Sequence, residues 1–428
     1  MSITTRVVTP ARAVPGAPSI DSIRARFPAI GRGTVFLDNA GGSQLPADVI
    51  DAVQRYMTES YVQTGAEYAA SVRASANVAS ARSVVRAFLN AQGRGEVIFG
   101  PSTTVLLYTL ADAYADARTT GAIDLSRDEI VVCTAGHEAN IGPWMRLARR
   151  GFTIREWQAR ADDAGLVRPR METLHELLSS RTLLVVFPQV SNILGEIWDA
   201  AAVCAAARSV GAQSVIDGVA YAPHHAPDVA ALGCDWYVYS TYKVFGPHMG
   251  ALFGTTDAFA PLTGPNHVFI DRANTAHKWE IGGANHEGCA AIAALPQYAR
   301  FLTAMPGTEV SHELFAAAFE AVAPHEQELE RRILGYLAGR RGVRIVGPGI
   351  GQGPRVSTIS FAKAGASSAG IARHLNARGL GAKAGHFYSK RLCDSMGLGP
   401  EGVVRVSPVH YNNAEELDEL FRALDDVL

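Results

Sequence analysis

Short apolar strands alternate with helical segments through the middle of the chain, and this alternation restricts the possible folds most. The strand-like stretches are EVIFG (96–100), EIVVC (129–133), TLLVVFPQV (182–190), QSVIDG (213–218) and DWYVYS (235–240). Helix-like runs such as TTVLLYTLADAYADA and WDAAAVCAAARSVGA separate them. Near-continuous apolar strands joined by helices predict an α/β fold, with a mostly parallel sheet covered on both faces.

The pattern changes after about residue 300. A long helical stretch, SHELFAAAFEAVAPHEQELERRILGYLAGR, leads to strand-like VRIVG and STISFA, and a last helix-like run ends the chain. This order predicts a smaller α+β domain at residues 301–428. We expect a large domain at residues 36–300, and residues 1–35 are expected to join the small domain.

Composition indicates a soluble protein of the cytoplasm. The chain has 428 residues, 48% of them hydrophobic, and 39 basic side chains balance 41 acidic ones. This balance argues against nucleic acid or a membrane surface as the partner. The first 18 residues lack the apolar core of a signal peptide, and no apolar stretch has transmembrane length. Five scattered cysteines without a CxxC pair fit a reducing compartment, and they give no support for a metal site.

One lysine follows the last of these strands, in the stretch YSTYKVFGP (239–247). A lone lysine at a strand end is usually solvated. A lysine that forms a Schiff base with an aldehyde cofactor must instead be partly desolvated and held against that cofactor by other groups. Lys243 is therefore a candidate only if such partners occur elsewhere in the chain.

Candidate partners stand at the ends of other strands, where ligands bind in open α/β sheets. Asp217 ends QSVID, and a carboxylate there can pair with a protonated pyridine nitrogen; alone, it would be read as a helix cap or turn residue. His137 follows EIVVC, where its ring can stack on a cofactor. Hydroxyls that suit a phosphate group, or that simply cap a helix, are Ser102, Thr103, Thr104 and Ser240.

These stretches together resemble the class V aminotransferase family of fold type I pyridoxal-phosphate enzymes, and the cysteine desulfurase-like branch most of all. The matching motifs run in order along nearly the whole chain: FLDNAGGSQLP (36–46), HEANIGPW, VSNILGE, DGVAYAPH, YSTYKVFGP, WEIGGANHEG and VVRVSPVHYNN (403–413). The resemblance implies a seven-stranded, mostly parallel sheet in the large domain and pyridoxal 5'-phosphate as the cofactor.

The resemblance also implies roles for individual residues. Lys243 occupies the position of the Schiff-base lysine, Asp217 that of the pyridinium-pairing aspartate, and His137 that of the ring-stacking histidine. Asn192 matches the asparagine near the cofactor's 3-hydroxyl and the substrate. Arg405 matches the arginine that binds the substrate carboxylate, a two-point contact suited to guanidinium.

Members of the family share active sites across a homodimer, which implies a homodimer here. Gly283 and Ala284 stand where a Thr-Pro pair is common, so that a phosphate contact to the neighbouring subunit would come from Asn285 or from backbone. Tyr242 precedes the lysine where the family often has histidine, and it remains a cofactor-binding candidate.

The sequence departs from the desulfurases at their catalytic thiol. Their Arg-x-Gly-His-His-Cys loop corresponds here to residues 383–388. This correspondence implies that His386 and Tyr388 lie beside the substrate. The phenol of Tyr388 then stands where the desulfurases have their thiol. A phenol cannot carry a persulfide. Cys393, five residues further on, is best interpreted as a structural residue.

Lys243, Asp217 and Arg405 together with Tyr388 favour β-elimination from an amino-acid substrate. The predicted activity is that of a C–S lyase on cysteine or an S-substituted cysteine, with Tyr388 protonating the leaving atom or shaping the pocket. Transamination, epimerisation and decarboxylation-linked deamination share the first steps and stay open. A desulfurase, or a non-catalytic binding protein on the same fold, is the weaker alternative.

Overall fold

The computed structural model describes residues 18–162, 165–303, 305, 307 and 309–428. Its largest element is a seven-stranded sheet, whose order in space is β2 (Gly95–Gly100), β10 (Gly250–Thr255), β9 (Trp236–Ser240), β8 (Gln213–Asp217), β7 (Thr182–Pro188), β3 (Glu129–Cys133) and β4 (Thr153–Trp157). β10 runs antiparallel to both of its neighbours, and the other strands are parallel. The predicted α/β class and the mostly parallel sheet are confirmed.

Helices cover both faces of this sheet because alternate residues of each buried strand point to opposite sides. In β3, Ile130 and Val132 belong to one core and Val131 and Cys133 to the other. The first core includes residues of α4 (Thr103–Thr120), α5 (Gly142–Met145), α9 (Thr256–Phe259) and α10 (Thr275–Trp279). The second includes residues of α3 (Ala69–Phe88), α6 (Met171–Leu177), α7 (Ala200–Ser209), α8 (Val229–Leu232), α11 (His286–Thr303) and α12 (His312–Ala338).

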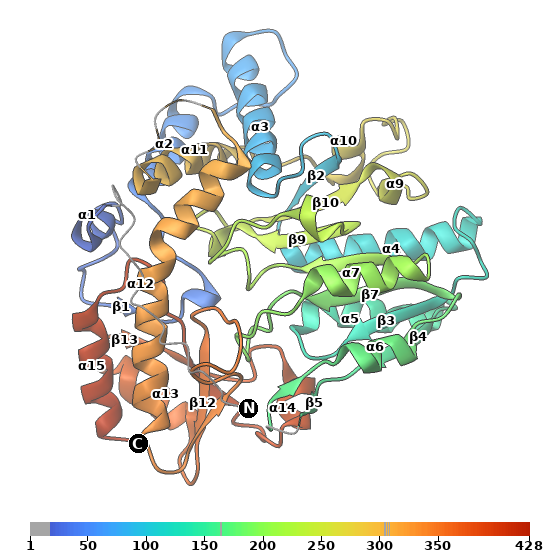
Figure 1. Ribbon diagram of the computed structural model, residues 1–428. Helices are drawn as coiled ribbons and strands as arrows, with labels where there is room; N and C mark the ends of the chain where they lie inside the picture. Colours follow the sequence, from blue (N-terminus) through green and yellow to red (C-terminus); the bar gives the residue numbers. More distant parts are fainter. Residues whose placement is uncertain (1–17, 163–164, 304, 306, 308) are drawn as a thin grey trace.

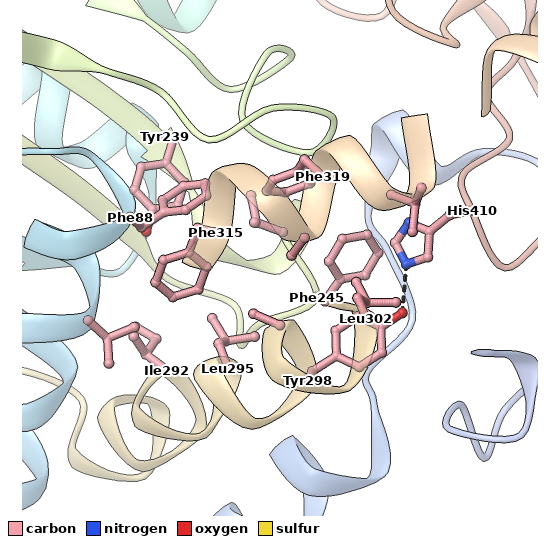
Figure 2. A pocket seen from close by; sticks show the side chains of 15 residues that line it. Phe88, Tyr239, Phe245, Ile292, Leu295, Tyr298, Leu302, Phe315, Phe319 and His410 are labelled. Carbon is pink, nitrogen blue, oxygen red and sulfur yellow. Dashed lines mark hydrogen bonds between the residues drawn. The ribbon is translucent and has the colours of Figure 1, made fainter. Parts of the chain in front are cut away.

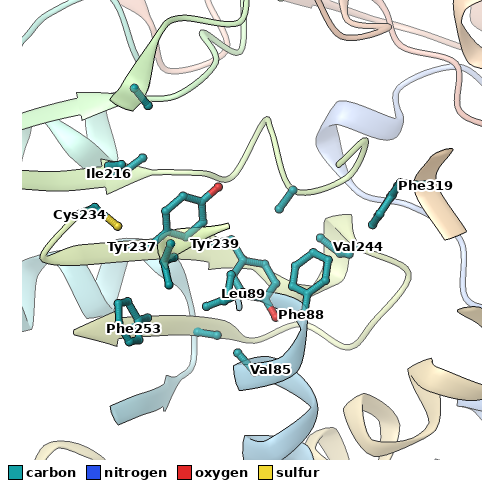
Figure 3. Packing of buried hydrophobic residues seen from close by; sticks show 14 of the residues in the cluster. Val85, Phe88, Leu89, Ile216, Cys234, Tyr237, Tyr239, Val244, Phe253 and Phe319 are labelled. Atoms are coloured by element: carbon teal, nitrogen blue, oxygen red, sulfur yellow. The ribbon is translucent and has the colours of Figure 1, made fainter. Parts of the chain in front are cut away.

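The second core fixes strand β9, which precedes Lys243. Figure 3 shows Tyr237 and Tyr239 of β9 close to Val85, Phe88 and Leu89 at the end of α3. Tyr237 and Tyr239 are almost fully buried. The end of β9 is thus held by packing and not only by its backbone hydrogen bonds.

An apolar cavity lies inside this core, between the end of β9 and helices α3, α11 and α12 (Figure 2). Its wall includes Val244 and Phe245, directly after Lys243, and Phe315 and Phe319 of α12. The Tyr298 hydroxyl and His410 Nε2 are hydrogen-bonded across its far end at 2.7 Å. The loop that carries Lys243 therefore has an apolar side that anchors it to the helices behind.

A second, four-stranded antiparallel sheet contains β11 (Val343–Val346), β12 (Ile359–Lys363), β15 (Val403–Val406) and β14 (Lys383–Gly385). It has its own core with α12, α13 (Ser368–Asn376) and α15 (Ala414–Asp425). The remaining helices are α1 (Ile20–Arg24), α2 (Ala47–Glu59) and α14 (Lys390–Ser395), and a short antiparallel pair joins β5 (Arg160–Ala161) and β6 (Val167–Arg168). Figure 1 shows α12 running from the large sheet to this second unit.

Strand β1 (Val35–Phe36) pairs in parallel with β13 (Leu380–Gly381), so the start of the described chain lies against its C-terminal part. The division at residues 35 and 300 stays a prediction, and residues 1–17 lie outside the described residues. No helix among residues 18–428, gaps aside, has the length and apolar character needed to cross a bilayer.

Candidate active site

The carboxyl ends of three strands of the large sheet supply the centre of the candidate site. β8 ends at Asp217, β9 is followed by the 3-10 turn Thr241–Lys243, and His137 follows β3. Parallel strands bring their carboxyl ends to one edge of a sheet, so these residues meet. They line a cavity, and the predicted residues in its wall are Thr103, Thr104, His137, Asn192, Asp217, Tyr242 and Lys243.

Lys243 lies in a loop that the N-terminal motif FLDNAGGSQLP holds in place. The Ser43 backbone N–H donates to the Tyr242 carbonyl at 3.1 Å, and the Phe245 N–H donates to the Ser43 hydroxyl at 2.9 Å. The amine makes no hydrogen bond or ion pair with any described residue and lies 5.8 Å from the centre of the Tyr242 ring. Burial, with Arg405 nearby, lowers the pKa of Lys243 to about 8. The amine therefore loses its proton readily, as an attack on an aldehyde requires.

Asp217 is a buried carboxylate with one oxygen left free. Its Oδ1 accepts the Val219 N–H at 2.9 Å, and its Oδ2 accepts no hydrogen bond from the described residues. Burial raises the pKa of Asp217 to about 6. A buried acceptor that lacks a partner and faces a cavity fits a cationic ring nitrogen of a ligand.

His137 is a neutral ring at the cavity wall. Its Nδ1 accepts the Ala139 N–H at 3.0 Å, which leaves the proton of the neutral imidazole on Nε2. Burial and the nearby charges of Lys243 and Arg405 lower the pKa of His137 to about 4. An uncharged flat ring in this place can stack on a cofactor ring without repelling a cation.

The start of helix α4 forms one end of the cavity. Ser102 caps the helix through the Val105 N–H, so the capping interpretation of this residue agrees with the structure. The Thr103 and Ser240 hydroxyls share a hydrogen bond of 2.7 Å. A Cβ at Gly250 would come within 2.5 Å of the Thr103 nitrogen, so glycine is needed for β10 to pass this close. Free N–H groups and hydroxyls at a helix start suit a phosphate.

Arg405 on β15 is buried and paired within the chain. Its Nη2 donates to Asp38 Oδ1 at 2.7 Å, and its Nη1 donates to the Asn192 carbonyl at 3.3 Å. Sequence reasoning missed Asp38, although it lies in the quoted FLDNAGG motif. Only its contact with Arg405, 367 positions further along the chain, distinguishes it from a turn residue.

Asn192 ties the cavity to the loop that contains Tyr388. Its amide nitrogen donates to the Phe387 carbonyl at 2.9 Å, and its amide oxygen accepts the Ser389 hydroxyl at 2.7 Å. Tyr388 is 64% exposed, and its ring centre lies 5.1 Å from that of His137. His386 is exposed, and its Nδ1 accepts the Tyr388 N–H. The structure thus brings Tyr388 next to His137, but neither Tyr388 nor His386 is among the residues that line the cavity.

Gly283 and Asn285 lie between α10 and α11, and they do not line the cavity of their own chain. The Asn285 side chain accepts the Gly288 N–H at the start of α11. Gly283 has φ +91°. Their predicted phosphate contact depends on a second subunit.

The chemistry of this set of residues fits pyridoxal 5'-phosphate. Lys243 would hold the aldehyde carbon, the free oxygen of Asp217 would face the ring nitrogen, and the start of α4 would bind the phosphate. The described residues contain no cluster of three metal-ligating side chains.

Comparison with known proteins agrees with this site. The model of the family "Aminotransferase class-V" matches residues 35–420. An aminotransferase-like protein, FGM3, from Gibberella zeae is 36% identical over 96% of this chain and 98% of its own length. A probable cysteine desulfurase of Pseudomonas putida is 30% identical over 95% of this chain and 97% of its own length.

Among solved structures, the cysteine desulfurase CsdA of Escherichia coli superposes with a TM-score of 0.76 at 25% identity, over 95% of this chain and 98% of that one. The fold is therefore that of the fold type I pyridoxal-phosphate enzymes. Class V aminotransferases and cysteine desulfurases use pyridoxal 5'-phosphate as their cofactor. The chain belongs to the class V aminotransferase family.

Proposed function

We propose that the protein is a pyridoxal-phosphate lyase that removes the sulfur substituent from Cβ of cysteine or an S-substituted cysteine. With water, RS–CH₂–CH(NH₃⁺)–COO⁻ gives pyruvate, ammonium and the thiol RSH. The observation that carries this proposal is the position of Tyr388: its ring centre lies 5.1 Å from that of His137, in the loop in which desulfurases carry their thiol.

The burial of the cysteines supports elimination over sulfur transfer. All five cysteines of the chain are buried. Cys393 is 1% exposed in α14, and burial raises the pKa of its thiol to about 11. A thiol that stays protonated and shielded is a poor nucleophile towards a substrate sulfur.

When bound, pyridoxal phosphate withdraws electrons from Cα of the amino acid and makes its proton easier to remove. Lys243 has the proton affinity for this removal, because its pKa of about 8 lets the neutral amine exist near neutral pH. Asp217 would keep the ring nitrogen protonated, and His137 would pack against the ring. Arg405 and Asn192 would orient the carboxyl end of the substrate.

In this proposal Tyr388 gives a proton to the departing sulfur. The Tyr388→Phe variant removes only the hydroxyl, so we expect thiol release to fall by roughly a hundredfold. The Tyr388→Ala variant also removes the ring that contacts His137 and should be slower still. Thiol release from S-methylcysteine, followed with a chromogenic thiol reagent, measures both effects.

Cys393→Ser is the matched control for this pair of variants, and it should release thiol within about twofold of the unmodified protein. The opposite order, with Cys393→Ser inactive and Tyr388→Phe unaffected, would contradict the lyase and support a desulfurase. Formation of an oxo acid without thiol would support transamination instead.

A homodimer is part of this proposal. Large apolar side chains are exposed in two segments: Met57, Tyr61, Tyr68 and Val72 lie from the end of α2 to the first turn of α3, and Val268, Phe269 and Ile281 lie on either side of α10. Figure 1 shows α2, α3, α10 and α11 at the same end of the molecule. Such surface is costly in water and favours a second copy as its partner.

We expect sedimentation equilibrium to give twice the chain mass at micromolar concentration. Phe269→Ser should weaken the dimer and lower activity in the same concentration range, because Gly283 and Asn285 would then lose the neighbouring cofactor. A protein that is monomeric and fully active when dilute would show that each site is complete within one chain.

A further inference from the structure

The Arg405 side chain is buried, and hydrogen bonds from two of its nitrogens hold it. Nη2 donates to Asp38 Oδ1 at 2.7 Å, and Nη1 donates to the Asn192 carbonyl at 3.3 Å. Each of these nitrogens has a second N–H to which no described residue is bonded, and Nε is buried without a partner among them. The guanidinium therefore keeps the N–H groups that a two-point contact with a carboxylate requires.

The Phe387 ring covers one face of this guanidinium. Its centre lies 4.0 Å from Cζ of Arg405, well within the separation of about 6 Å at which an aromatic face attracts a cation. A nitrogen that pointed straight at the ring would come too close at this distance, so the guanidinium lies against the ring with its flat side. Phe387 is 9% exposed and Arg405 3%, so little water competes with the contact.

Phe387 is itself held in place from two sides. Phe387 and Tyr388 have φ angles of +47° and +59°, which few residues other than glycine adopt. Asn192 Nδ2 donates to the Phe387 carbonyl at 2.9 Å, and the Glu138 N–H donates to the Tyr388 carbonyl at 2.8 Å. Because the Asn192 carbonyl also accepts from Arg405, one residue fixes the ring and the guanidinium relative to each other.

Hydrogen bonds at two nitrogens leave a flat group free to tilt about the line that joins the two acceptors, and a ring against its face limits this tilt. We propose that Phe387 is a positioning residue, which holds the plane of Arg405 so that the free N–H groups meet the carboxylate of the substrate. This inference rests on the role of Arg405 in the proposed function. Phe387 does not line the cavity, so it acts through Arg405 and not by touching the substrate.

Binding of norvaline and butylamine separates this role from a general effect on the pocket. Norvaline has a methylene in place of the sulfur of S-methylcysteine, so it has no leaving group on Cβ. Butylamine is the same molecule without the carboxylate. Titration of the full-length protein with its cofactor, followed by the visible absorbance of that cofactor, gives both affinities. In Phe387→Leu, norvaline should bind about tenfold more weakly, and butylamine should stay within about twofold.

Phe387→His is the variant that should restore binding, because it keeps a flat ring. The cations of Arg405 and of Lys383, whose Nζ lies 6.0 Å from the Phe387 ring centre, favour the neutral form of this histidine. Norvaline should bind it within about threefold of the unmodified protein. Phe301→Leu is the matched control, because it removes a ring that lies 4.8 Å from the Arg26 guanidinium and does not line the cavity. It should change neither affinity.

Equal weakening of norvaline and butylamine in Phe387→Leu would overturn the inference, as would an unchanged affinity for norvaline or a Phe387→His variant as weak as Phe387→Leu. If Phe387→Leu does not fold, Phe387→Met makes the same comparison, since its flexible chain fills the space without an aromatic face. An unmodified protein that binds norvaline no better than butylamine would overturn the role of Arg405 in the proposed function, and the inference with it.

Discussion

Lys243→Ala should abolish turnover and leave pyridoxal phosphate held only by noncovalent contacts. The amine is partly buried, has no partner among the described residues, and is the lysine in the wall of the cavity. Its loss removes both the covalent anchor and the proposed base, and the two roles together are worth several orders of magnitude in rate. Borohydride reduction followed by peptide mass analysis should label Lys243 in the unmodified protein and no other lysine.

Two further variants separate chemistry from charge. Lys243→Arg keeps a positive charge near Asp217 but cannot form the covalent bond, so it should be as inactive as the alanine variant. Lys390→Ala removes an exposed lysine that pairs with Asp394, and it should behave like the unmodified protein. If Lys243→Ala kept full activity after dialysis, the site assigned here would be wrong.

Asp217→Asn should lower turnover by a factor of about 10² to 10⁴, because removing one partner of a buried charge pair costs roughly 3–5 kcal/mol. The asparagine keeps the size of the side chain and its contact with the Val219 N–H. Stopped-flow absorbance after mixing with substrate measures the loss in the first chemical step. An unchanged rate would mean that another carboxylate faces the cofactor.

The pH dependence of cofactor binding gives an independent check on Asp217. Burial raises the pKa of its carboxyl to about 6, so the carboxylate is charged above this pH and takes up a proton below it. The charged form is the one that pairs with a protonated ring nitrogen. Affinity for the cofactor should therefore fall as pH drops below about 6, and the fall should be smaller in Asp217→Asn, which has no proton to gain.

The sequence predicted the parts of the fold that local pattern determines. β3, β7, β8 and β9 are apolar runs because helices cover both of their faces, and such runs are readable without a structure. β4 was not predicted, because this edge strand, TIREW, is polar and partly exposed. β10, GALFGT, was not predicted either, because Gly254 has no side chain and interrupts the apolar pattern by which a strand is recognised. The missing side chain leaves room for the Trp236 ring.

The site could be predicted where it depends on strand ends. Asp217, His137 and Lys243 follow strands whose carboxyl ends meet at one sheet edge, so their meeting follows from topology. The Asp38–Arg405 pair could not be predicted, because it joins segments 367 residues apart. The placement of Phe387 and Tyr388 depends on φ angles that their residue types disfavour and that distant contacts with Asn192 and Glu138 maintain.

The stoichiometry of products from S-methylcysteine tests the lyase most directly. The protein with its cofactor should release methanethiol, ammonia and pyruvate in a ratio of one to one to one, with no alanine. Release of alanine from cysteine, with a persulfide trapped on Cys393, would contradict the lyase and establish a desulfurase.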